Sequence, residues 1–329
     1  MKRKLVFKQL GILFILTLMS LFVTCKEGTA VSEKIISMEL SLEVSRFDRE
    51  FANASRESLE ALKKEYPYLF PEQYADSVWY LKLQDTLQQS LLEEIDLAFG
   101  DFKEEKDGLE MLFKHIRYYF PGQPVPKIVT VSSDVDYNNR VILADTLLLI
   151  GLDNYLGTDH RFYTGIDRYI AEGFDKKFLE SDVAAAFAKK VIPPPTDRTF
   201  LSQMIYYGKE LYLKDQLLPL VPDEDKIGYT QEHYQWAQAN EEQIWRYFVE
   251  NELLYSTDRK LGPRFLEPAP FSKFRLMLDN ESPGRIGRYM GWQIVKAFAR
   301  NNNVSLKELL KTPGKTIFEQ ANYKPKKKL

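Results

Sequence analysis

Cysteine and histidine, two residue types that often act as nucleophiles or metal ligands, are scarce in this chain of 329 residues. It has a single cysteine, Cys25, so no disulfide can form within the chain. Its three histidines, His115, His160 and His233, are too far apart in sequence to form a local pair of metal ligands. For His115 and His233 we expect structural or surface roles. The HExxH, G-x-S-x-G, P-loop and dinucleotide-binding motifs are all missing, which removes the usual sequence signals of zinc peptidases, serine hydrolases and nucleotide-binding enzymes.

The chain also lacks a strong excess of one charge. Its net charge is −2, and its first 24 residues carry four basic and no acidic side chains, so the remainder carries −6. A mildly acidic domain has no basic face for neutralising phosphates, which argues against a nucleic-acid partner. Beyond the N-terminal apolar run, no second segment is apolar enough to span a membrane.

The N-terminus has the pattern of a lipoprotein signal peptide. Four basic residues lie within residues 2–8, and an apolar run of about 14 residues follows over 10–23. The run ends in Phe22-Val23-Thr24-Cys25, a loose match to the site at which bacterial lipoproteins are cleaved and acylated on cysteine. We therefore expect a signal peptide over 1–24, and a lipidated Cys25 followed by a polar tether up to residue 35. The alternative is an ordinary thiol within an uncleaved N-terminal anchor.

The rest of the chain predicts an α+β fold that is mainly α-helical, with a small β-sheet beside a single helical domain over 36–323. Alternation over 36–47 predicts a strand, and the apolar runs 127–133 and 141–150, on either side of Asn138-Asn139, predict a small sheet. A basic, disordered tail is expected over 324–329. Apolar spacing, caps and prolines predict helices over 55–66, 83–100, 106–120, 177–191, 199–217, 231–252, 283–301 and from the capping box Ser305-x-x-Glu308.

Three polar or glycine-rich segments are candidates for a site. Asp153, Asp159 and His160 cluster after the second apolar run, where they favour turns but could also hold a cation. The acidic segment 222–225 is expected to be a solvated loop, with cation binding as the alternative.

The helix expected from Pro283 contains Gly284, Gly287 and Gly291, and each glycine costs about 1 kcal/mol of helix propensity relative to alanine. Glycine allows another backbone to approach closely, so we expect a buried central helix. The functional alternative is that Arg285 or Arg288 lines a ligand-binding cleft.

Taken together, several short motifs in order along the chain resemble the gliding motility lipoprotein B family (GldB) of Bacteroidota. The matching segments are Arg46-Phe-Asp48, Gly151-Leu-Asp-Asn-Tyr-Leu-Gly157, Gly208-Lys-Glu-Leu-Tyr212 with Leu217-Leu-Pro219, Ile227-Gly-Tyr-Thr230, Trp236 with Asn240-Glu241 and Ile244-Trp245, Pro270-Phe-Ser-Lys273, and Pro283-Gly-Arg-Ile-Gly287 through Val295.

This resemblance implies a lipid-anchored, non-enzymatic component of the cell envelope that gliding motility requires, with other envelope proteins of the gliding machinery as partners. It implies no cofactor, no metal and no catalytic residue. Lys26 follows Cys25 where lipoproteins kept in the inner membrane carry aspartate, which favours the outer membrane. We expect the domain on the periplasmic side of that membrane, with the cell surface as the alternative.

A second likeness concerns the fold alone. The order of elements is similar to that of gluzincin-type metallopeptidases, in which one helix carries HExxH and the next carries a glutamate before a glycine. Here the first helix has Ser181-Asp-Val-Ala-Ala-Ala-Phe187, and Tyr207 precedes Gly208. A degenerate zincin-like fold is therefore an open alternative, with a peptidase-like enzyme or a small-ligand-binding lipoprotein as the rival function.

Overall fold

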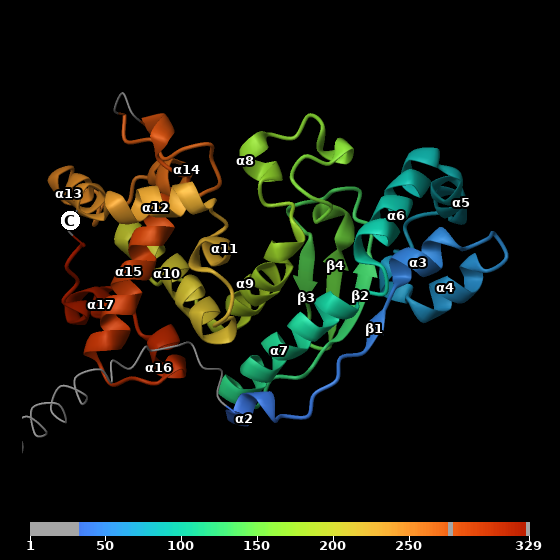
Figure 1. The fold of residues 1–329 in the computed structure, drawn as a ribbon, viewed down its shortest axis with the longest axis horizontal. Helices are drawn as coiled ribbons and strands as arrows, with labels where there is room; N and C mark the ends of the chain where they lie inside the picture. The colour runs from blue at the N-terminus through green and yellow to red at the C-terminus, as the bar shows by residue number, and fades with distance from the viewer. Residues whose placement is uncertain (1–32, 276–278, 327–329) are drawn as a thin grey trace, which may run out of the picture.

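The protein was analysed as a computed structural model that describes residues 33–275 and 279–326. Within these residues helices dominate and one four-stranded sheet is present, which confirms the mainly helical α+β fold (Figure 1). The signal peptide expected over 1–24, Cys25 and residues 327–329 lie outside the described part of the chain. No helix within that part has both the length and the apolar character needed to cross a membrane.

The sheet has the strand order β1-β2-β4-β3. Strands β1 (Val44–Ser45), β2 (Lys127–Val131) and β4 (Leu147–Gly151) are parallel, and the edge strand β3 (Val141–Leu143) is antiparallel to β4. The two apolar runs therefore form the sheet as expected, and the second run is divided into the antiparallel pair β3 and β4.

The strand expected over 36–47 is mostly wrong. Ile36, the first residue of the expected strand, is the last residue of the short helix α2 (Glu33–Ile36). Within the range 36–47, only the two residues of β1 pair with the sheet. Leu42 is buried, and its backbone N–H donates to the Glu110 carboxylate at 3.0 Å instead of to a neighbouring strand. Helix α2 packs on the long helix α7 through the buried Ile35.

The N-terminal helices pack around the sheet on the right in Figure 1. Asp85 ends one helix and begins the next, because its side chain accepts hydrogen bonds from the backbone N–H groups of Leu87 and Gln88. The helix expected over 83–100 is therefore interrupted at Asp85, and its first residues belong to a separate helix. The second helix ends as predicted at Gly100, which has a φ of +44°. These helices are α3 (Phe47–Ala52), α4 (Leu59–Glu65), α5 (Asp76–Gln84), α6 (Thr86–Phe99) and α7 (Lys103–Tyr119).

The middle of the chain connects the sheet to the C-terminal helices. It contains α8 (Arg168–Ala171), α9 (Leu179–Val191), α10 (Phe200–Leu217) and α11 (Asp223–Ile227). The solvated loop expected over 222–225 is wrong, since Asp223 begins α11. Two of its acidic side chains are paired with lysines: Asp223 with Lys226 and Lys296, and Asp225 with Lys177.

The C-terminal helices form a second group on the left in Figure 1. The helix expected over 231–252 is divided at Asn240, and the capping box at Ser305 is confirmed. Glu241 is buried and accepts hydrogen bonds from Tyr289, Tyr323 and the backbone of Lys326. The group consists of α12 (Gln231–Ala239), α13 (Glu241–Glu250), α14 (Leu261–Phe265), α15 (Ile286–Asn301), α16 (Leu306–Lys311) and α17 (Gly314–Ala321).

Helix α15 is the buried central helix that its glycines predicted, although it begins at Ile286 and not at Pro283. It crosses α10 where Gly208 faces Gly291. A Cβ atom at Gly291 would lie 1.8 Å from the carbonyl oxygen of Met204, and one at Gly208 would lie 2.3 Å from the Gly291 backbone. Glycine is therefore required at both positions because the two backbones are in direct contact.

Candidate functional site

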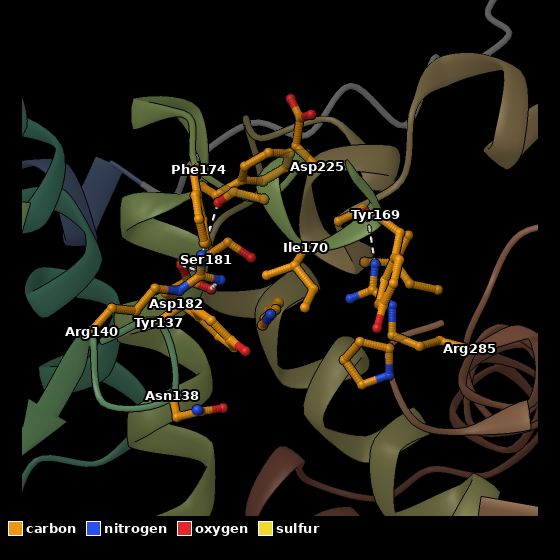
Figure 2. A pocket seen from close by; sticks show the side chains of 16 residues that line it. Tyr137, Asn138, Arg140, Tyr169, Ile170, Phe174, Ser181, Asp182, Asp225 and Arg285 are labelled. Atoms are coloured by element: carbon orange, nitrogen blue, oxygen red, sulfur yellow. Dashed lines mark hydrogen bonds and ion pairs between the residues drawn. The ribbon is translucent and has the colours of Figure 1, made fainter. Parts of the chain in front are cut away.

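A cavity of about 350 Å³ lies where α8 and the β2–β3 loop face helices α9, α10 and α11 and the start of α15 (Figure 2). Residues far apart in sequence converge there. Arg140, Lys214 and Arg285 supply positive charge, and Asp182 and Asp225 supply negative charge. Figure 2 shows Arg140 and Arg285 on opposite sides of the cavity.

Arg140 and Asp182 form one wall of the cavity. The Arg140 guanidinium lies 2.9 Å from the Asp182 carboxylate, and its Nη1 donates to the carbonyl oxygen of Gly173 at 2.8 Å. The Tyr155 hydroxyl donates to the same carboxylate at 2.9 Å. Burial, followed by the charge of Asp182, raises the pKa of Tyr155, so this hydroxyl stays protonated and keeps donating. Asp182 is thus fully engaged.

Lys214 reaches the cavity from the buried face of α10. Its residue is only 5 % exposed, and Nζ donates to the carbonyl oxygen of Lys226 at 3.0 Å. The nearest carboxylate oxygen, on Glu210, is 3.6 Å from Nζ. Burial lowers the pKa of Lys214; the carboxylates of Glu210 and Asp182 act in the opposite direction, and the positive charges of Arg288 and Arg285 lower it further. A negative charge in the cavity would favour its protonated form.

Arg285 lies just before α15 with a left-handed backbone, φ +58°. Its Nη2 donates to the carbonyl oxygen of Gly228 at 2.6 Å, and its guanidinium lies 5.7 Å from the centre of the Tyr229 ring. Burial lowers the pKa of Arg285 to about 10, with Arg288 as the next contributor. Within 33–275 and 279–326, no carboxylate forms an ion pair with Arg285.

The lysine next to this cavity belongs to a separate, balanced network. Lys226 Nζ lies 3.1 Å from both Asp215 and Asp223, and Lys296 Nζ lies 3.1 Å from Asp223. Trp292 donates its indole N–H to Asp215 at 2.8 Å. Two lysines and two aspartates therefore neutralise one another, and this network holds α10, α11 and α15 together.

Aromatic and apolar side chains complete the lining of the cavity. The rings of Tyr137 and Phe174 lie 5.9 Å apart and are tilted by 37°. Tyr169 and Ile170 of α8 face them, and Ile170 projects into the middle of the cavity in Figure 2. The cavity therefore combines fixed cations with an apolar wall, a combination typical of small-molecule sites.

The acidic cluster that the sequence singled out does not assemble. Asp153 is buried and accepts hydrogen bonds from the backbone of Ser133 and Val135, so it holds the β2–β3 loop. Asp159 is paired with Arg168 at 2.9 Å, and His160 lies 3.4 Å from Glu94. Each group has its own partner.

The histidines are likewise separate. His115 is buried in α7, where Nδ1 bonds to the carbonyl oxygen of Met111 at 2.9 Å, and His233 lies in the first turn of α12. Nowhere in the described ranges do three His, Cys, Asp or Glu side chains gather closely enough to hold a metal ion.

Of the two arginines proposed for a cleft, Arg285 lines the cavity and Arg288 does not. Arg288 donates to the carbonyl oxygen of Leu266 and lies over the Tyr207 ring at 3.9 Å. Sequence reasoning missed Arg140 and Lys214. The only signal for Lys214 was a lysine on the apolar face of a helix, which by itself does not identify a binding residue.

The helices of the metallopeptidase-like pattern are α9 and α10, which pack against each other. Ser181 and Asp182 of α9 line the cavity, whereas Ala184 is buried in the core. The ring of Tyr207 on α10 is in contact with the guanidinium of Arg288, as described above. The zincin-like fold remains an expectation from the order of the elements.

The fold and cavity define a mainly helical α+β protein with a positively charged, aromatic-lined cavity between its sheet and its C-terminal helices. The chain belongs to the family of the gliding motility protein GldB, whose family model matches residues 28–325. No curated protein and no solved structure gave a significant match. The family is that of a gliding motility lipoprotein, as the ordered motifs indicated.

Proposed function

We propose that the protein is a lipid-anchored, non-enzymatic component of the gliding apparatus. An acylated Cys25 would hold it on the periplasmic side of the outer membrane, and its helical domain would act by contact with other envelope proteins of the machinery. Membership of the gliding motility family over residues 28–325 is the observation that carries the proposal.

The anchor is supported by the position of Cys25. The cysteine follows a basic segment and an apolar run, and the family match begins three residues after it. Acyl chains contribute about 0.8 kcal/mol of membrane affinity per buried CH₂ group, so a multiply acylated cysteine holds a domain stably at the surface. Lys26 in place of aspartate supports the outer membrane.

The non-enzymatic role is supported by the chemistry of the cavity. A serine nucleophile needs an adjacent base, and Ser181 Oγ instead donates to the carbonyl oxygen of Lys226 at 3.3 Å. None of the three histidines is among the residues that line the cavity. The carboxylate of Asp182 is already bound to Arg140 and Tyr155.

The lipid anchor is tested by the Cys25→Ala variant. We expect the wild-type protein to incorporate labelled palmitate and to fractionate with the outer membrane, and the variant to lose the label because its acylated thiol is gone. Unchanged labelling of Cys25→Ala would contradict the anchor.

The role in gliding is tested by deleting the gene and restoring it in two forms, wild type and Cys25→Ala. We expect only the wild-type gene to restore spreading over a surface, with an immunoblot confirming that both proteins accumulate. If the deletion strain still glides, the proposed function is wrong even where the lipid is found. If only the wild-type gene restores gliding, crosslinking in wild-type cells would identify the envelope proteins that contact the domain.

A further inference from the structure

The cavity between α8 and α15 carries more positive than negative charge. Its two carboxylates are both used: Asp182 pairs with Arg140, and Asp225 lies 2.7 Å from Lys177. Lys214 has Glu210 at 3.6 Å, outside the lining of the cavity. Arg285 has no ion pair within the residues that the structure describes, and the guanidinium of Arg288 adds further positive charge nearby.

Arg285 is held in place with donors to spare. A guanidinium has five N–H groups, and the bond to the Gly228 carbonyl oxygen uses only Nη2. Gly228 has a φ of +71°, and a Cβ atom there would lie 3.3 Å from the Arg285 nitrogens. The guanidinium is therefore positioned against Gly228 before any ligand arrives, which lowers the entropic cost of binding.

The partial burial of the Arg285 charge is unfavourable without an anion. Moving a cation away from water is unfavourable unless an opposite charge or several hydrogen bonds compensate for it. The lowered pKa values of Arg285 and Lys214 reflect the same cost, since burial is the largest cause of both. An anion between these two groups would relieve it.

The side of the cavity away from Arg285 is suited to the rest of the ligand. Tyr137 and Phe174 present rings there, and Ile170 projects between them and Arg285 (Figure 2). The volume of about 350 Å³ is at the lower end of the range for small-molecule sites. This space suits a compact ring or short apolar body and not a polymer.

We propose that the cavity binds a small organic anion. Arg285 and Lys214 hold its carboxylate or phosphate group, and Tyr137 and Phe174 contact its ring or apolar body. This binding site goes beyond the lipid-anchored role proposed above, and it stands or falls separately from that role.

Three probes of similar size test the proposal on the full-length, detergent-solubilised protein. Phenylacetate carries the ring and a carboxylate, phenyl phosphate carries the ring and a phosphate, and phenylacetamide carries the ring without charge. Binding is measured by saturation-transfer NMR on the probe, up to about 10 mM, near the weakest affinity expected for a ligand of ten to eleven heavy atoms. We expect at least one anion to bind saturably and the neutral amide to bind about tenfold more weakly or not at all.

Variants locate the binding. Arg285→Gln should weaken binding of the anion about tenfold or more, and Arg285→Lys should retain part of it because the positive charge remains. Lys214→Met provides a second, independent removal of charge if Arg285→Gln lowers the melting temperature. The matched control is Arg246→Gln, an exposed arginine on α13 whose loss should leave binding unchanged.

The outcomes distinguish the two classes of anion from each other and from no binding. Binding of phenylacetate alone identifies a carboxylate ligand, and binding of phenyl phosphate alone identifies a phosphate ester. Two results would overturn the proposal: no saturable binding of either anion, or anion binding that is equal in wild type, Arg285→Gln and Lys214→Met.

Discussion

Gly291 shows how a single position limits the fold. It faces the Met204 carbonyl across the crossing of α10 and α15, at a distance that leaves no room for a methyl group. Alanine would favour the helix by about 1 kcal/mol, but the backbone of α10 would have to move. We expect Gly291→Ala to lower the free energy of unfolding by about 3 kcal/mol or more.

The measurement is denaturant unfolding followed by circular dichroism. Gly122→Ala is the control, because Gly122 is exposed and a Cβ atom there meets nothing within 4 Å. We expect its effect to stay within about 0.5 kcal/mol. Equal effects of the two substitutions would show that α10 and α15 are not in backbone contact.

His115 makes stability depend on pH. Burial lowers the pKa of its imidazole below the ordinary value, so the folded state resists protonation. As pH falls through the range from about 6.5 downward, the unfolded chain takes up the proton first, and stability is lost over the interval down to the folded-state pKa. Above both values the effect vanishes.

His115→Gln removes this titration and keeps a donor for the Met111 carbonyl. We expect the free energy of unfolding of the wild type to fall more steeply between pH 7 and pH 5 than that of the variant, by at most about 1.4 kcal/mol per pH unit. Glu180 lines a small pocket together with His115, separate from the cavity described above, and burial raises the pKa of Glu180, but Glu180 titrates in both proteins. Parallel pH profiles would refute the assignment.

Capping decides where the helices of this protein begin. Ser305 accepts from the Glu308 backbone and Glu308 accepts from the Ser305 backbone, which together satisfy two N–H groups at the start of α16. We expect Ser305→Ala to cost about 1 kcal/mol of stability and Ser305→Thr to cost much less, since threonine keeps the hydroxyl. Thermal unfolding of the two variants distinguishes them, and equal losses would exclude the cap as the cause.

Long periodic helices and apolar strands were predictable because their signals are local. The capping box, the close-packed glycines of α15 and the strands β2 and β4 each follow from a few neighbouring residues. The breaks at Asp85 and Asn240 were not predicted, since the apolar spacing continues across both.

The cavity was the least predictable part. Its cations come from residues 140, 214 and 285, which meet only because β3 packs on α9 and α10 packs on both α9 and α15. Sequence reasoning named Arg285 as one of two alternatives and missed the others. It also grouped Asp153 with Asp159, whereas the fold gives each a different partner.

On the scale of the whole molecule, the placement of the histidines predicts metal content. A catalytic zinc ion needs about three protein ligands and an activated water. His115 bonds to its own helix and His160 faces Glu94, and the three histidines lie on separate elements. We expect elemental analysis of the purified protein to find no stoichiometric zinc. One zinc ion per chain, lost on substitution of any of these histidines, would favour the enzyme.

The packing of α2 on α7 has a consequence for how far the protein can reach. With Ile35 buried, α2 is part of the folded body, and Glu33 at its start lies eight residues after the proposed anchor. Eight residues span at most about 28 Å even when fully extended. The start of the domain would then stay within that distance of the membrane surface, and a periplasmic partner would have to approach the bilayer to bind it.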